Sequence, residues 1–220
     1  TYQYLASLNP WLQQPRFLLN NRIQEQYAGF KGSAGTHVTY DARVSYLQFS
    51  NQPLFVNDTI TGKSFQVINE SAMKAIRIHG EVGYTMQENI SLLAGVTFNQ
   101  YSNLSDNEKA WGLLPIEVNA SLRWQVLKDF LVKSDFYFWD GPQYRNKTLQ
   151  SQKLKPAADL NLGVEFTIIP NLNAWVQMNN LFNNKYERWN QYPVLGFNVL
   201  AGVVYSFGDI KTKLKTLGTE

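Results

Sequence analysis

The feature that most constrains the fold of this chain is a strict alternation of apolar and polar side chains over unusually long segments. In residues 116–125, for example, Ile116 and Val118 alternate with Glu117 and Asn119. Successive side chains of a β-strand point to opposite faces, so this period of two predicts a strand with one apolar and one polar face. The same pattern occupies residues 38–46, 76–84, 90–99, 132–138, 158–167 and 197–207, and a weaker form occupies 22–30, 172–182 and the short stretch 1–6.

The length of these segments favours a membrane-spanning structure. Strands in soluble globular proteins usually have about 5–6 residues, whereas a tilted strand that crosses a bilayer needs about 9–11. The mean hydropathy of −0.31 agrees with this reading, because barrel strands alternate and keep their average low. We therefore predict an all-β fold, a transmembrane antiparallel up-and-down β-barrel with about ten strands in this chain. A soluble lipocalin-like barrel, with its apolar face inward, is the alternative.

The connections between the predicted strands alternate between short and long. The short ones lie near residues 31–35, 85–89, 126–129 and 169–171, and the long ones span 7–20, 49–72, 101–114, 140–156 and 183–195. Outer-membrane barrels have short periplasmic turns and long extracellular loops. The alternation therefore predicts that the final strand descends and ends in the periplasm.

Composition excludes several other classes of protein. The chain has no cysteine, so it has neither a disulfide framework nor a thiolate metal site, and its net charge of +3 is too small to indicate nucleic acid as a partner. Only His37 and His79 could act as imidazole ligands or bases, and they lie on different predicted strands. We expect no catalytic residue, cofactor or metal site. An outer-membrane hydrolase that uses His79 is a minor alternative.

Charged residues recur on the polar faces of the predicted strands. In a barrel these faces surround the lumen. We interpret them as a polar wall that faces the lumen, either as a solvated interior in which the charges pair with one another or as a surface that contacts a solute. The wall residues are Asp41, Arg43, Arg77, Glu81, Glu117, Arg123, Lys133, Asp135, Asp159 and Glu165.

The long connections are rich in aromatic side chains. Trp111 and Trp139 lie near strand ends, which favours an interfacial aromatic belt. The residues in the middle of predicted loops are better candidates for binding an extracellular ligand. These residues are Tyr144, Arg145, Arg188 and Trp189.

A motif before the last strand resembles a known family. It consists of residues 179–183 (NNLFN), then Tyr186, the pair Tyr192-Pro193, Gly196 and a terminal strand that ends at Phe207. This order is similar to the end of TonB-dependent outer-membrane transporters, and the similarity covers roughly residues 155–207. The resemblance implies a barrel of about 22 strands with an N-terminal plug, which the charged residues of the polar wall would face. It also implies uptake of a scarce solute, of the siderophore, glycan or peptide class, across the bacterial outer membrane.

The resemblance implies the partners as well. They are the outer-membrane lipid, an N-terminal plug with the remaining strands, a TonB-type energy transducer, and the barrel-assembly machinery, which would read Tyr205 and Phe207 as a terminal signal. We expect residues 1–207 to be barrel strands with their loops and residues 208–220 to be a polar tail. The abrupt start favours a C-terminal portion of a larger barrel. A small barrel without a plug, with a binding or structural role, is the alternative.

Overall fold

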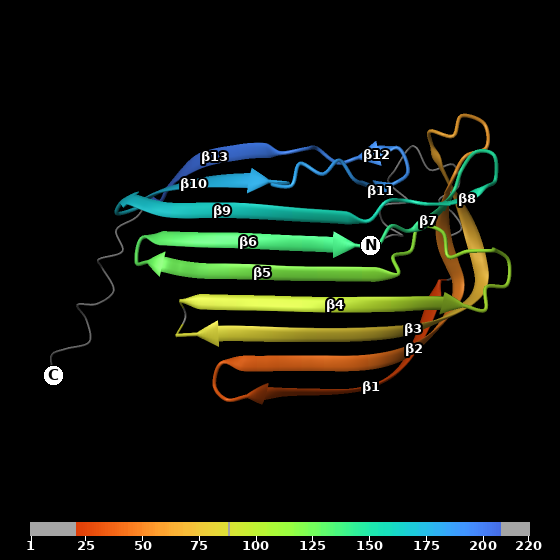
Figure 1. Cartoon of the computed structure of the whole chain (residues 1–220), viewed down its shortest axis with the longest axis horizontal. Helices are drawn as coiled ribbons and strands as arrows, with labels where there is room; N and C mark the ends of the chain where they lie inside the picture. Colours follow the sequence, from red (N-terminus) through yellow and green to blue (C-terminus); the bar gives the residue numbers. More distant parts are fainter. Residues whose placement is uncertain (1–20, 88, 208–220) are drawn as a thin grey trace.

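The computed structural model describes residues 21–87 and 89–207, and all regular structure within them is β-strand. Nine strands form one antiparallel sheet, in which each strand pairs with the next (Figure 1). They are β1 (Arg22–Ala34), β2 (Val38–Asn57), β3 (Phe65–Met86), β4 (Ile90–Ser102), β5 (Ile116–Leu127), β6 (Phe130–Trp139), β9 (Ala157–Ile169), β10 (Leu172–Asn179) and β13 (Asn198–Tyr205). Two short hairpins stand apart: β7 (Gln143–Arg145) with β8 (Ser151–Lys153), and β11 (Glu187–Trp189) with β12 (Tyr192–Pro193).

This topology confirms the predicted all-β, antiparallel, up-and-down architecture. β1 and β13 are the two edges of the sheet, and within the described residues they do not pair with each other. The predicted strand at 1–6, the loop at 7–20 and the tail at 208–220 lie outside the described residues. No helix among the residues that the structure describes is long and apolar enough to cross a membrane.

The register places the two sequence patterns on opposite faces of the sheet. Val44 lies opposite Ile78, which lies opposite Phe98 on the next strand, so the apolar sets of adjacent strands share one face. We call this the outward face, and the polar face the inner face. Apolar side chains on the outward face are widely exposed, as Val44 at 53% and Val203 at 68% illustrate. A continuous exposed apolar face is what a membrane-spanning sheet presents to lipid.

Short turns join the strands at one end of the sheet, which we call the turn end. Gly35 and Asn171 adopt positive φ there, of 67° and 70°, and glycine and asparagine are the residues that tolerate this conformation. The opposite end, the loop end, carries all the long connections. Its long connections and the short turns alternate along the chain, as the sequence predicts for these described segments.

At the loop end the prediction of a long loop over residues 49–72 is wrong. β2 and β3 continue to Asn57 and from Phe65, and reach 20 and 22 residues. Asn51, with φ of 55°, interrupts the pairing between the two strands. Up to this point the odd-numbered side chains Leu47 and Phe49 are buried, and beyond it Leu54 and Val56 are buried, while the register of β2 with β3 stays the same. Because the buried positions change from odd-numbered to even-numbered residues, a search for period two does not detect the strand.

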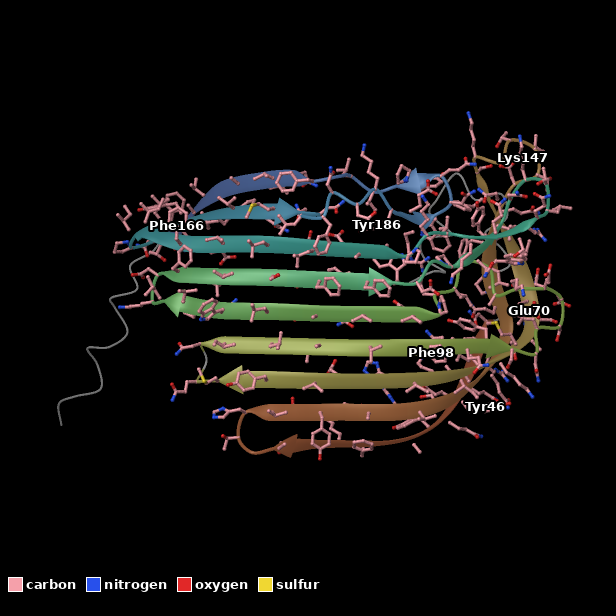
Figure 2. All side chains as sticks on the ribbon, in the orientation of Figure 1. Tyr46, Glu70, Phe98, Lys147, Phe166 and Tyr186 are labelled. Atoms are coloured by element: carbon pink, nitrogen blue, oxygen red, sulfur yellow. The ribbon has the colours of Figure 1, made fainter. Side chains whose placement is uncertain are left out.

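The tightly packed part of the molecule lies at the loop end rather than along the sheet. Figure 1 shows β2 and β3 bending out of the sheet there, toward the β7–β8 and β11–β12 hairpins. Figure 2 shows side chains crowded around Glu70 and Lys147. We call this region the outer lobe; it comprises residues 50–72, 103–115, 140–156 and 180–197. Its buried apolar residues include Leu54, Val56, Val67 and Trp111.

Candidate functional site

The ten predicted wall residues all lie on the inner face. Asp41 lies opposite Glu81, and Arg123 lies opposite Lys133. Residues directly opposite one another on adjacent strands point to the same face of the sheet. The structure does not gather the ten into one cluster, because they are spread over β2, β3, β5, β6 and β9. They share one face of the sheet and form no focused centre, and their contact with a plug or a solute stays a prediction.

Only some of these charges have partners within the described wall. Lys133 forms an ion pair with Glu165. The guanidinium Nε of Arg77 donates to the Asn99 side-chain oxygen at 2.8 Å. Two pairs of like charge lie directly opposite one another, Asp41 with Glu81 and Arg123 with Lys133, although Lys31 also lies opposite Asp41 and Glu165 pairs with Lys133. Such pairs are destabilising unless opposite charges approach them.

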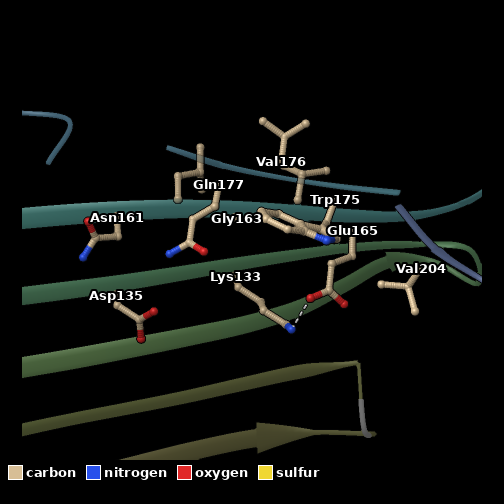
Figure 3. Close-up of a pocket in the computed structure, with 11 residues that line it drawn as sticks. Lys133, Asp135, Asn161, Gly163, Glu165, Trp175, Val176, Gln177 and Val204 are labelled. Atoms are coloured by element: carbon tan, nitrogen blue, oxygen red, sulfur yellow. Dashed lines mark hydrogen bonds and ion pairs between the residues drawn. The ribbon is translucent and has the colours of Figure 1, made fainter. Parts of the chain in front are cut away.

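A first pocket lies on the inner face over β6, β9, β10 and β13 (Figure 3). It has a volume of about 440 Å³. The Trp175 ring lies flat against the sheet because Gly202 faces it: a Cβ at Gly202 would lie 2.8 Å from the ring. The polar side chains that line this pocket are Lys133, Asp135, Asn161, Glu165 and Gln177.

A second pocket lies where the inner face meets the outer lobe; we call it the loop-end pocket. It has a volume of about 340 Å³ and combines two guanidinium groups with a single carboxylate, from Arg77, Arg188 and Glu117. Asn99 at its edge is buried and donates its side-chain NH₂ to the Leu114 carbonyl at 3.2 Å. The remaining lining residues are Ile23, Phe49, Gln52, Tyr101, Leu113 and Leu114. Such a lining suits a polar solute with anionic or hydrogen-bonding groups.

A buried carboxylate holds the loop over residues 103–115 against β3. Glu70 is fully buried, and its oxygens accept the backbone N–H groups of Ser105, Asp106 and Asn107 at 2.5, 3.0 and 2.9 Å. The loop returns the contact, since Asp106 accepts the N–H of Ser71 at 2.7 Å. Hydrogen bonds from Ser71 hold the pKa of Asp106 below its usual value. No local pattern marks Glu70, because its partners lie some 35 residues away.

The tip of the β2–β3 hairpin is closed by a second carboxylate. Asp58 is buried and accepts the backbone N–H groups of Ile60, Thr61 and Ser64 at 2.9, 2.6 and 3.0 Å, and the hydroxyls of Thr61 and Ser64 at 2.8 Å. Burial opposes ionisation of Asp58, but these hydrogen bonds outweigh it and hold its pKa well below the usual value. The tip is therefore a fixed turn.

Arg188 and Trp189, two of the predicted ligand residues, join separate parts of the outer lobe. Arg188 donates to the Gly112 carbonyl at 3.2 Å and lies over the Trp189 ring, 4.6 Å from its centroid. Trp189 in turn makes edge contacts with Phe55 and Phe65, at centroid distances of 5.4 and 5.9 Å. Trp189 thus packs against the bent end of β2 and β3, whereas Arg188 bonds to the loop over residues 103–115 and lines the loop-end pocket.

The other two predicted ligand residues, Tyr144 and Arg145, lie on β7 in the same lobe. The Tyr144 hydroxyl donates to Gln152 on β8. Burial and the nearby Glu187 raise the pKa of Tyr144, and burial lowers the pKa of Arg145. The Gln143 carbonyl on β7 accepts the N–H of Gly112 at 2.8 Å, and the Gly112 carbonyl accepts from Arg188. All four predicted ligand residues therefore lie near Gly112.

The two tryptophans assigned from the sequence to an interfacial belt pack against other side chains of the protein. Trp111 is 3% exposed and packs with Leu54 and Val56, while Trp139 packs against Tyr186 at a centroid distance of 4.8 Å. The belt interpretation is therefore wrong for both. Proximity to a strand end does not distinguish a ring that faces lipid from one that a folded loop covers.

The motif that precedes the last strand is a joint between the wall and the outer lobe. Asn180 and Asn183 have φ of 50° and 48°, a conformation that asparagine tolerates. The Asn180 side chain donates to the carbonyls of Asn184 and Leu195 at 3.0 and 2.9 Å and accepts the Asn184 N–H at 3.0 Å. Asn183 accepts the Phe197 N–H, and a Cβ at Gly196 would lie 2.6 Å from its oxygen. The motif therefore sets where β10 stops, at Asn179, and where β13 starts, at Asn198.

Tyr186, the tyrosine of the motif, ties this joint to the inner face. Its hydroxyl donates to Asp159 at 2.6 Å. Burial and the Asp159 carboxylate raise the pKa of Tyr186, so it acts as a neutral donor at physiological pH. At the end of β13, the Tyr205 ring meets the ring of Phe207, two residues further on, edge to face at a centroid distance of 4.8 Å, and Phe207 is 92% exposed.

The two histidines are separate from each other. His37 lies 2.9 Å from the Thr85 carbonyl at the turn end, and His79 lies 2.9 Å from the Thr97 hydroxyl on the inner face. Among residues 21–87 and 89–207 no group of three or more His, Cys, Asp or Glu side chains could hold a metal ion.

The sequence matches no family model and no curated protein, but solved structures of outer-membrane receptors share its fold. Each likeness covers 85% of this chain. The FrpB iron transporter from Neisseria meningitidis has 15% identity and a TM-score of 0.63 over 31% of its length. The pyoverdine outer membrane receptor FpvA from Pseudomonas aeruginosa has 13% and 0.65 over 30%, and the siderophore receptor PirA from Acinetobacter baumannii has 10% and 0.68 over 32%. The chain therefore spans about a third of the length of these structures. Its sheet has the fold of an outer-membrane β-barrel wall.

Proposed function

We propose that this chain is the C-terminal wall and outer lobe of a TonB-dependent transporter that imports a scarce solute across the bacterial outer membrane. The observation that carries the proposal is the combination of an apolar outward face of membrane-spanning length with a charged inner face that ends in the loop-end pocket. The shared fold with siderophore and iron receptors supports it. The joint built by Asn180, Asn183 and Tyr186 supports it as well.

The proposed mechanism needs a plug inside the barrel. Glu81 lies opposite Asp41, and Arg123 lies opposite Lys133, so an interior partner with a basic group near Glu81 and an acidic group near Arg123 would stabilise the wall. The pocket beside Trp175 offers further hydrogen-bonding groups to such a partner. In this proposal, a TonB-type transducer acts on the plug, while the wall stays fixed.

The loop-end pocket is the proposed place of solute contact on this part of the barrel. Arg77 and Arg188 outnumber the single carboxylate of Glu117, so the pocket favours an anionic solute. A guanidinium binds carboxylates and phosphates through paired hydrogen bonds. Siderophores, acidic glycans and peptides with free carboxyl groups all carry such acceptors.

An uptake assay tests this function. Cells that lack the gene should lose energy-dependent uptake of one member of a panel of iron chelates, acidic oligosaccharides and peptides, and the full-length gene should restore it. Removing the TonB-type transducer should abolish that uptake. Equal uptake with and without the transducer would refute the transporter proposal. A native gene product of about 220 residues plus a signal peptide would do so too, and would favour the small barrel without a plug.

A paired substitution tests the pocket. Arg77→Gln should raise the half-saturating solute concentration about tenfold, the order expected for the loss of one charge-assisted hydrogen bond, with little change in the maximal rate. The matched control is Arg123→Gln, which removes an inner-face arginine outside the pocket. If both variants raise the half-saturating concentration equally, the pocket does not contact the solute.

A further inference from the structure

The side chains of the outward face change from apolar to polar at one corner of the sheet, at the loop end of β1 to β4. On β2, counting from Val38 at the turn end, Gln48 is the eleventh residue, and on β4, counting from Ile90, Gln100 is also the eleventh. Both side chains are exposed. A tilted strand needs about 9–11 residues to cross the hydrocarbon layer, so these glutamines lie where the headgroups of the outer leaflet begin. Figure 2 labels Tyr46 and Phe98 at this end of the sheet. They are the outward residues two positions closer to the turn end than Gln48 and Gln100.

Two cations accompany these glutamines. On β1, counting from Ala34 at the turn end, Gln24 is the eleventh residue and Arg22 the thirteenth. On β3, counting from Met86, Lys74 is the thirteenth residue. Lys74 lies directly opposite Gln48, which lies directly opposite Gln24. The register therefore places all of these side chains on the outward face in one contiguous patch. We call it the outward polar patch: Arg22, Gln24, Gln48, Lys74 and Gln100.

β5 and β9 lack this feature. Counting in the same way, the twelfth residues of β5 and β9 are Ile116 and Ala158, both on the outward face. None of the outward positions at this height on β1 to β4 is an aspartate or glutamate. Glu70, further along β3, is fully buried and bonded to the loop over residues 103–115, so it does not neutralise the patch. The patch thus combines cations and amides at headgroup height on β1 to β4.

We propose that the outward polar patch binds the phosphorylated headgroup of an outer-leaflet glycolipid. Arg22 and Lys74 supply positive charge for phosphate, and the three glutamines supply donors and acceptors for the sugar hydroxyls. Charge complementarity selects this occupant, because zwitterionic lipids offer no net charge to two cations. The inference depends on the placement in the outer membrane and not on transport of any solute.

Lipid binding by the full-length protein tests the proposal. The protein, purified from membranes and delipidated in nonionic detergent, is titrated with diphosphoryl lipid A, and bound lipid is counted by native mass spectrometry. We expect at least one lipid A to remain bound to the wild type. The double variant R22Q/K74Q should bind it at least tenfold more weakly, whereas the charge-conserving R22K/K74R should retain most of the affinity.

The matched control is K31Q/R123Q, which removes two cations from the inner face. It should bind lipid A like the wild type. Three results would overturn the proposal: equal loss in the control, equal binding of dephosphorylated lipid A, or unchanged binding in R22Q/K74Q. If the double variant does not fold, the single variant K74Q should show a smaller loss in the same direction, and no loss in K74Q would also refute the proposal. Solute uptake is measured separately, so its failure leaves this result unaffected.

Discussion

The wall and the outer lobe of this chain differ in how their apolar side chains are shielded from water. Along the wall, large apolar side chains remain exposed, as Val96 at 45% and Val199 at 52% show. In the outer lobe, apolar side chains such as Leu54 and Val56 are almost fully buried, and so are the carboxylates of Asp58 and Glu70. The wall thus relies on lipid to cover its apolar face, whereas the lobe buries its own core as a small soluble domain does.

The comparison shows which interactions hold each region. The wall is held by ladder hydrogen bonds between adjacent strands, and its side chains need only match the solvent on each face. The lobe has little regular pairing between strands. Its loops are held instead by carboxylates that each accept several backbone N–H groups. A substitution should therefore disturb the region to which its side chain belongs and leave the other largely intact.

The largest expected effect is that of a charge placed on the outward face of the wall. Val96→Arg should destabilise the folded barrel by about 2–4 kcal/mol, because the seventh residue of β4 lies near the middle of the bilayer. The control on the other face is Thr97→Arg, which places the guanidinium beside Glu117. Unfolding in urea from lipid vesicles measures both. An equal cost for the two variants would mean that the outward face does not contact lipid.

Next in size is the effect of removing the carboxylate that anchors the loop. Glu70→Ala should destabilise the outer lobe by about 2 kcal/mol, because three backbone N–H groups lose a charged acceptor. Hydrogen exchange should rise across residues 103–115 and stay unchanged in β9 and β10. Glu70→Gln, which keeps an acceptor oxygen, should restore part of the protection. A rise that extends through the wall would remove the distinction between the two regions.

A smaller effect is expected at the joint between them. Asn180→Ala should cost about 1–2 kcal/mol, because it removes three hydrogen bonds and leaves an alanine at positive φ. Asn180→Gly removes the same bonds without backbone strain and should cost less. Heat-induced loss of the folded form on gel electrophoresis ranks the two. If glycine costs more than alanine, the strained backbone is not a significant part of the effect.

The smallest effect is a dependence on pH at the tip of the β2–β3 hairpin. Because the folded pKa of Asp58 lies below its value of 3.8 in the unfolded chain, the unfolded state takes up a proton first as the pH falls. The stabilisation is complete above the unfolded pKa and is lost as the pH falls toward the folded pKa. Protease cleavage at the tip should therefore increase below about pH 4. Asp58→Asn should be cleaved faster at pH 7 and show a weaker dependence on pH over this range.

Much of the wall could be predicted from the sequence. The alternation in residues 76–84 and 116–125 identified strands and assigned each side chain to a face, including all ten charged wall residues. The weaker pattern at 172–182 placed β10 but ended it three residues late, because Asn180 leaves the strand with a positive φ. The solute, the plug and the terminal assembly signal at Tyr205 and Phe207 stay predictions.

What the sequence determined by itself is the architecture that depends on local order: strand, face and direction follow from a period of two and from the lengths of the connections. The tertiary structure alone decided the outer lobe. The anchoring of the loop by Glu70 and the hydrogen bond from Arg188 to Gly112 join residues 35 and 76 positions apart. No local pattern encodes such contacts, because they form only when one long hairpin folds across the end of the sheet and brings distant loops into one core.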